Sequence, residues 1–239
     1  ESGTWILGQS FNESEWPENR MPDRQVLDRL APDNPVCIWR CDCHLAVANS
    51  KALTLAGIDN DFVPPEGAVV DRDENGTPTG ILKELAPNLI TSVVPEPGRK
   101  QLMANLEEAQ SRCHRLGLTG IHDVRLMGGV DGADALAGFQ DFHAAGKLKI
   151  RCLVDLAGEQ TDQAVDLGLR SGFGDDLLRI GWLKFFADGG MGARTAWMYE
   201  PYLDAGGSCG MPLTPVPEIE AKVNKADRAG LACMVHSLG

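Results

Sequence analysis

The sequence predicts an α/β protein in two parts, and three observations support this. From residue 98 onward, apolar segments with helical period alternate with short apolar segments typical of strands. Residues 1–97 instead mix short strands with short helices, as an α+β unit does. Residues 95–98, with two prolines and a glycine, separate the two patterns. We therefore expect an α+β subdomain at 1–97 and a β-α repeating part at 98–239.

In the first part, apolar runs at 5–10 and 36–40 predict strands, and 23–31 and 50–57 predict short helices. Ser50 could cap the second of these helices, and Asn49 could stabilise the turn before it. A hairpin is expected within 69–84, around Asn75 and Gly76. This pair favours a type I′ turn because both residues tolerate positive φ.

In the second part, apolar residues at spacings of three and four between 102 and 116 predict a helix that ends at Gly117. The following elements are expected to be strands at 119–124, 149–155, 178–188 and 231–237 and helices at 132–148, 161–171 and 217–230, with Asp131 as the cap of the first of these helices. Such alternation favours a parallel sheet with helical crossovers. Both a doubly wound sheet and a (β/α)8 barrel are compatible with it.

Composition excludes several classes of protein. The 22 Lys and Arg residues against 34 Asp and Glu residues give a net charge of −12, which argues against a nucleic-acid-binding protein. The chain has no apolar run of roughly 18 residues, so no membrane span is expected. Seven scattered cysteines, an odd number, favour free thiols in a reducing compartment, here the cytoplasm. The spacing of Cys41, Cys43 and His44 is unlike that of a zinc site.

Lys184 is the first candidate for chemistry. In a strand over 178–188, Leu183, Phe185 and Ala187 share one face, which is suited to packing under helices. Trp182, Lys184, Phe186 and Asp188 share the other face. Burial among aromatic rings lowers the pKa of an amine and so favours its neutral, reactive form. Such an amine could form a Schiff base with a carbonyl substrate or a carbamate with CO2. It could also simply pair with Asp188 or lie at the edge of the strand.

His236 is the second candidate, because it closes the strand at 231–237. The carboxyl ends of parallel strands are where ligands gather, so this imidazole could bind a metal or a substrate. A hydrogen-bonded core histidine is the alternative. Lys184 and His236 are one β-α step apart.

Other residues are candidates for substrate contacts. Asp188 and Arg194 belong to a glycine-rich segment that follows the strand and reads as a flexible loop, with Arg194 as a possible partner for an anion. His44 has no evident structural role and could also contact substrate. Asp123 could support the site or cap a helix, and His122 is expected to point away from it.

Several motifs in order resemble one family. They are Asp42-Cys-His44-x4-Asn49-Ser50, Asp71-Arg-Asp-x2-Gly76-x-Pro78-Thr-Gly80, Leu183-Lys184-Phe-Phe-Ala-Asp188-Gly189 and Val235-His236-Ser-x-Gly239. Together they resemble the amidohydrolase superfamily, in particular its long-chain metal-dependent hydrolase branch, which includes N-substituted formamide deformylase.

The resemblance implies a metal-dependent (β/α)8 TIM barrel, with 1–97 as an inserted subdomain and the four later strands as strands two to five. It implies that Lys184 is a carboxylated, metal-bridging lysine and His236 a metal ligand, with zinc as the expected metal. His44 would lie in the insertion loop over the pocket. The implied activity is hydrolysis of C–N bonds other than peptide bonds in a small-molecule amide or cyclic amide, by a metal-activated water.

The sequence also departs from this family. It contains no His-x-His, and the aspartate expected as general base would lie beyond Gly239. Two ligands are fewer than the three that a catalytic zinc site needs. We therefore expect the chain to be a fragment that is inactive alone, with an absent or incomplete metal site and with sheet edges that could favour a homo-oligomer. A Schiff-base lyase that uses Lys184 and a non-catalytic structural fragment are the alternatives.

Overall fold

A computed structural model describes residues 2–125 and 132–239, which form two compact units. The first unit contains Glu1–Val94, Asp188–Leu213 and Ser237–Gly239, and the second contains Pro95–Ala187 and Thr214–His236. The predicted division at 97/98 lies close to the first crossing between the units. It differs at 188–213 and 237–239, which the structure places in the first unit because they bond to it, as when the Gly190 N–H donates to Glu84 Oε1.

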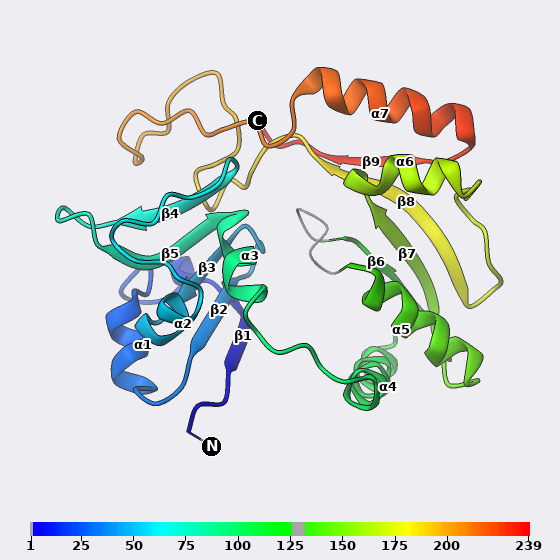
Figure 1. The fold of residues 1–239 in the computed structure, drawn as a ribbon, viewed down its shortest axis with the longest axis horizontal. Coiled ribbons are helices and arrows are strands. Elements are labelled where there is room, and N and C mark those ends of the chain that lie inside the picture. Colours follow the sequence, from blue (N-terminus) through cyan, green and yellow to red (C-terminus); the bar gives the residue numbers. More distant parts are fainter. Residues whose placement is uncertain (1, 126–131) are drawn as a thin grey trace. The chain divides into compact units, whose positions relative to one another are not determined.

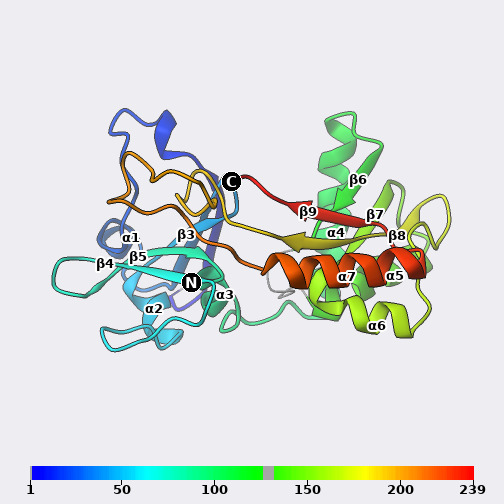
Figure 2. The ribbon, with the colours of Figure 1, turned by 90° about the horizontal axis from the view of Figure 1, so that it is seen from above.

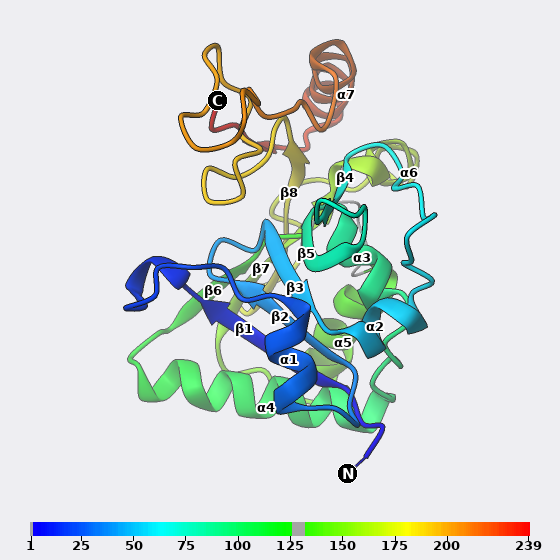
Figure 3. The same cartoon turned by 90° about the vertical axis from the view of Figure 1, so that its left-hand side faces the viewer.

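The first unit is built on a five-stranded sheet of order β1-β2-β3-β5-β4. Its elements are β1 (Ile6–Phe11), α1 (Arg24–Leu30), β2 (Val36–Arg40), β3 (Leu45–Ala48), α2 (Ser50–Leu55), β4 (Ala68–Arg72), β5 (Pro78–Glu84) and α3 (Ala86–Thr91). The β1–β2 pair is parallel and the other pairs are antiparallel. Figure 3 shows β1, β2 and β3 side by side. The expected helices are confirmed, whereas β3 and α3 were not predicted.

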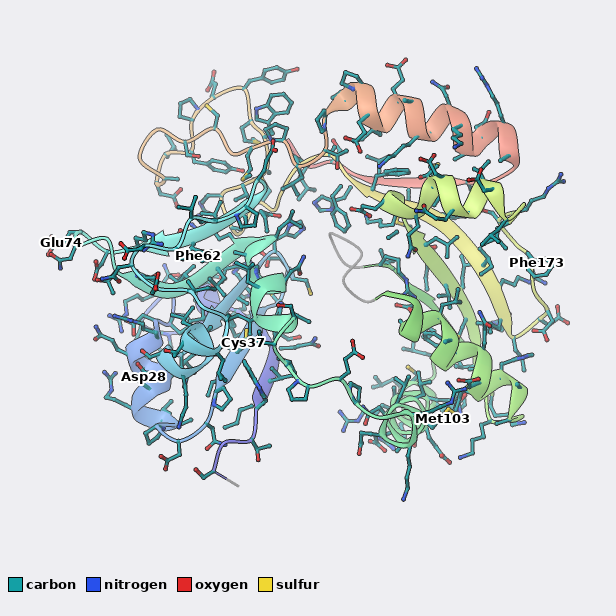
Figure 4. The ribbon with its side chains drawn as sticks, viewed as in Figure 1. Asp28, Cys37, Phe62, Glu74, Met103 and Phe173 are labelled. Carbon is teal, nitrogen blue, oxygen red and sulfur yellow. The ribbon has the colours of Figure 1, made fainter. Side chains whose placement is uncertain are left out.

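Asn49 explains why α2 begins where it does. Its side chain is 1% exposed and accepts hydrogen bonds from the N–H groups of Ala52 and Val36, each at 3.0 Å. The first bond caps α2, so the cap is Asn49 and the prediction of Ser50 is wrong, because Ser50 instead bonds to Asp28. The second bond fixes the start of β2. Cys37, labelled in Figure 4, is fully buried in the core that this arrangement closes.

The β4–β5 hairpin has a different turn from the one expected. Only Gly76 has a positive φ, of 78°, whereas a type I′ turn requires a positive φ at Asn75 as well. The Asp73 carboxylate instead accepts hydrogen bonds from the N–H groups of Asn75 and Thr77, at 2.9 Å each, and so stabilises the alternative turn. Glu74 lies at the tip of the hairpin in Figure 4.

The second unit is a parallel sheet with helical crossovers. Its elements are α4 (Arg99–Arg115), β6 (Gly120–Asp123), α5 (Gly132–Ala144), β7 (Arg151–Ala157), α6 (Thr161–Asp166), β8 (Leu178–Phe186), α7 (Val216–Ala229) and β9 (Cys233–His236). These elements match the predicted order throughout. Figures 1 and 2 show α7 running alongside β9. The predicted helix cap at Asp131 lies outside the described residues.

The strand order β6-β7-β8-β9 bears on the two sheet types that the sequence left open. All three pairs are parallel, and each β-α step adds the next strand on the same side. A doubly wound sheet would reverse direction at a switch point. The second unit is therefore a curled parallel sheet of the half-barrel type.

The two faces of this sheet have different roles. Leu183 and Phe185 of β8 pack with Leu156 and Ala226 in a buried cluster that includes residues of α6 and α7. The expectation that Leu183 and Phe185 face the helices is confirmed. Residues that alternate with them lie on the opposite face.

In the described part of the chain, no helix combines the length and apolarity needed to cross a bilayer.

Candidate active site

Lys184 and His236 lie on neighbouring parallel strands of the second unit. The backbone register pairs Phe186 with His236 and Lys184 with Met234. Paired residues share a face, and so do residues two apart in one strand. Lys184, Phe186 and His236 therefore share the face opposite the helices.

One aromatic ring contacts both candidate residues. The Nζ of Lys184 lies 4.6 Å from the centroid of the Phe186 ring. The centroid of the His236 ring is 5.4 Å from the same point, with the two planes inclined at 42°. Phe186 thus brings the amine and the imidazole to one apolar surface at the carboxyl ends of β8 and β9.

Lys184 lies in a largely buried environment. The residue is only 8% exposed, and burial lowers the pKa of its ammonium group below the usual value. The negative charge of Asp155 opposes this shift with a smaller effect. Among the residues that the structure describes, the ion pairs do not include Lys184.

Asp155 is a buried residue that sequence reasoning missed. It is fully buried, and its Oδ1 lies 2.7 Å from His122 Nε2 and accepts a hydrogen bond of 2.8 Å from the Trp182 N–H. The His122 ring also meets the Trp182 ring edge-on, at 5.0 Å and 90°. The prediction that His122 points away from the site is therefore wrong. Which face of the sheet a residue of β6 occupies depends on the register between β6 and β7, and the sequence of β6 alone does not reveal that register. An aspartate inside an apolar strand was the available signal for Asp155.

In the first unit, His44 belongs to a buried polar network. Its Nδ1 is 2.9 Å from Glu84 Oε2, and the two residues are 6% and 2% exposed. The hydroxyl of Thr195 donates a hydrogen bond to Glu84 Oε1. Glu84 has a φ of 55°, a left-handed conformation that is uncommon outside glycine. His44 therefore has a structural role, and the predicted substrate contact stays a prediction.

Gly189 and Gly190 allow the chain to pass close to this network. A Cβ at Gly190 would lie 2.7 Å from His44 Cγ, and one at Gly189 would lie 2.5 Å from Glu84 Oε1. These contacts are too short for any side chain. Close packing explains both glycines without a phosphate ligand.

Replacing Gly190 by alanine is expected to lower the free energy of unfolding by about 2 kcal/mol, because the new methyl group must displace His44. Gly120→Ala is the matched control, since its Cβ would meet its neighbours only at the ordinary distance of 3.6 Å. Urea denaturation of both variants measures the difference. Equal stability of the two variants would contradict the role assigned to Gly190.

Asp188 and Arg194 already have partners within the first unit. Asp188 is 3% exposed and accepts three backbone hydrogen bonds, from Trp197, Leu238 and Gly239. The guanidinium of Arg194 forms a two-point ion pair with Asp204, at 2.8 and 2.6 Å. The loop that carries them is thus anchored. Their predicted contacts with substrate stay predictions.

Lys184 and His236 fit part of a metal site. A carboxylated lysine offers oxygen atoms and a histidine offers a nitrogen, and zinc accepts both kinds of ligand. Within residues 2–125 and 132–239, no cluster of three or more His, Cys, Asp or Glu side chains could hold a metal ion. Cys41 and Cys43 are free and exposed.

The parallel sheet, the sequence motifs and the placement of Lys184 and His236 point to one class of protein. Comparison of the sequence with known protein families identifies this class. The sequence profile of the Amidohydrolase family matches residues 1–239. The chain therefore belongs to the amidohydrolase family.

Individual relatives agree with this assignment. YtcJ of Bacillus subtilis, described as a putative amidohydrolase, is 33% identical over 98% of this chain and 44% of its own length. N-substituted formamide deformylase of Arthrobacter pascens is 33% identical over 78% of this chain and 35% of its own length. The crystal structure of an uncharacterized metal-dependent hydrolase from Pyrococcus furiosus superposes with a TM-score of 0.62, at 30% identity, over 99% of this chain and 47% of that one. The chain spans less than half the length of these relatives, as the prediction of a fragment requires.

Proposed function

We propose that the full-length protein is a metal-dependent hydrolase of C–N bonds other than peptide bonds, in an amide or cyclic amide. The observation that carries this proposal is the placement of Lys184 and His236 on one sheet face, in contact with the same Phe186 ring. The deformylase relative supports the reaction class, and the metal-dependent hydrolase from Pyrococcus furiosus supports the need for a metal. In this proposal β6 to β9 are strands two to five of a (β/α)8 barrel, and 1–97 supplies most of an inserted subdomain.

Lys184 is proposed to act as a carboxylated lysine. Its neutral amine nitrogen adds to the carbon of CO2 and releases one proton, which leaves an anionic carbamate. Burial favours this step because it disfavours the ammonium form. Because Lys184 and His236 share a sheet face, the carbamate and the imidazole would together offer two metal ligands.

We propose zinc as the divalent metal; when bound, it would supply Lewis-acid chemistry for the hydrolysis of the amide by water. The chain's own residues would hold this metal and orient the substrate. Lys184 and His236 would provide ligands. Substrate contacts by His44, Asp188 and Arg194 are a separate proposal that rests on the sequence motifs alone. The general base and the remaining ligands are proposed to lie in other parts of the full-length protein.

Because two ligands cannot complete the site, we propose that the 239-residue chain is inactive alone. We further propose a small-molecule substrate, a cytoplasmic location and self-association of the chain through its sheet edges, with no nucleic-acid or membrane partner. Size-exclusion chromatography with light scattering tests the self-association.

Labelling with ¹³C-bicarbonate tests the role of Lys184. We expect the full-length protein to show a carbamate carbon signal that disappears in Lys184→Met and persists in Lys149→Met, where the replaced lysine is exposed. Absence of a carbamate signal in the wild-type protein would contradict the proposal. Borohydride treatment with a carbonyl substrate separates the lyase alternative, because a Schiff base at Lys184 would be trapped and a carbamate would not.

A further inference from the structure

The strands that carry Lys184 and His236 end together. The Ala187 N–H donates a hydrogen bond of 2.8 Å to the carbonyl of His236, beyond the paired residues Phe186 and His236. Immediately after this bond, both segments leave the second unit, at Asp188 and at Ser237. His236 is thus the last residue of its strand, a position where the backbone frays unless the following residues are held.

The backbone that follows His236 donates hydrogen bonds to the side chain of Asp188. Asp188 Oδ1 accepts a hydrogen bond from the Leu238 N–H at 2.9 Å, and Oδ2 accepts one from the Gly239 N–H at 2.7 Å. Oδ2 also accepts a bond of 2.8 Å from the Trp197 N–H. One buried carboxylate therefore connects the segment after β8, the segment after β9 and the loop at Trp197. Hydrogen bonds to a charged acceptor are stronger than neutral ones.

Gly239 gives independent evidence for this close approach. A Cβ at this position would lie 2.0 Å from the carbonyl oxygen of Trp197 and 2.5 Å from its nitrogen. Backbone atoms cannot yield as a flexible side chain can. Only glycine lets the segment after β9 lie against Trp197, where Asp188 binds both.

We infer that Asp188 is a positioning residue, which fixes the path of the chain after β9 and thereby holds the His236 imidazole beside the Phe186 ring and Lys184. Its importance for metal binding rests on the proposed function, whereas the positioning itself does not. A contact with substrate is not needed to explain this aspartate.

Asp188→Asn tests the inference, because the amide keeps the size of the side chain but replaces one acceptor oxygen with a donor. In NMR measurements of amide exchange on the full-length protein, we expect the amide protons of Leu238, Gly239 and Trp197 to exchange at least roughly tenfold faster, as for a local opening. We also expect the ring signals of His236 to shift, while those of His44 stay in place. Asp204→Asn, in the same loop but in an exposed ion pair, is the matched control and should change neither.

Gly239→Ala should have the same effect, because its Cβ would force the segment after β9 away from Trp197. We expect faster amide exchange at Leu238 and Trp197 and the same shift of the His236 ring signals. Unchanged exchange in Asp188→Asn, or unmoved His236 signals despite faster exchange, would overturn the inference. In the full-length protein, Asp188→Asn should weaken Co²⁺ binding measurably, while Asp204→Asn should not. If instead His236→Ala leaves Co²⁺ binding unchanged, the proposed metal site fails, and the exchange result still decides the positioning role.

Discussion

Replacing Lys184 by methionine in the full-length protein is expected to remove the bound metal and to lower kcat/KM by about a thousandfold or more, which corresponds to roughly 4 kcal/mol of transition-state stabilisation. Methionine fills the same apolar space against Phe186 but cannot react with CO2. The loss should therefore come from the missing carbamate ligand, with little change in folding. Metal analysis and steady-state kinetics measure the two effects.

Two further variants test whether the missing carbamate causes the loss of metal and activity in Lys184→Met. Lys149→Met removes an exposed lysine and should keep both metal and activity. Lys184→Ala leaves space beside Phe186, so that acetate or propionate can supply the missing carboxylate and restore part of the activity. Retention of metal and activity by Lys184→Met would contradict the role proposed for this residue.

Replacing Glu84 by alanine should lower the free energy of unfolding of the first unit by about 3 kcal/mol, because a buried partner of His44 is lost. Thr195 also loses its acceptor in Glu84, and the segment at Gly190 loses one of its anchors. Glu74→Ala, at the exposed tip of the β4–β5 hairpin, is the control and should change stability little.

Glu84→Gly separates the side chain from the backbone. Both substitutions remove the carboxylate, but glycine adopts the φ of 55° without strain, so it should be more stable than the alanine variant by about 1 kcal/mol. Urea denaturation followed by tryptophan fluorescence is suitable in a Trp182→Phe background, because the remaining tryptophans lie in the first unit. Equal unfolding energies for Glu84→Ala and Glu74→Ala would show that the network contributes nothing.

Local pattern sufficed to predict the elements of the second unit. Helical period and strand alternation are properties of neighbouring residues, so β6 to β9 and their helices could be read along the chain. The faces of Leu183 and Lys184 followed from alternation in the same way. Strand order could not be read, because it depends on which strands pair in space.

The features that could not be predicted from the sequence depend on contacts between residues far apart in the chain. The four residues of β3 are all buried and therefore lack the alternation that marks a strand. Glu84 meets His44 across 40 positions, and Asp188 meets Gly239 across 51. No local pattern carries such contacts, so the packing of the loop at 188–195 could not be predicted from the sequence.

An X-ray structure of the full-length protein, with data collected at the absorption edge of its metal, tests the central claim most directly. We predict an anomalous peak at about 2.0–2.2 Å from a carbamate oxygen on Lys184 and from a ring nitrogen of His236. An unmodified Lys184 amine, with the metal held by other residues and away from His236, would contradict it.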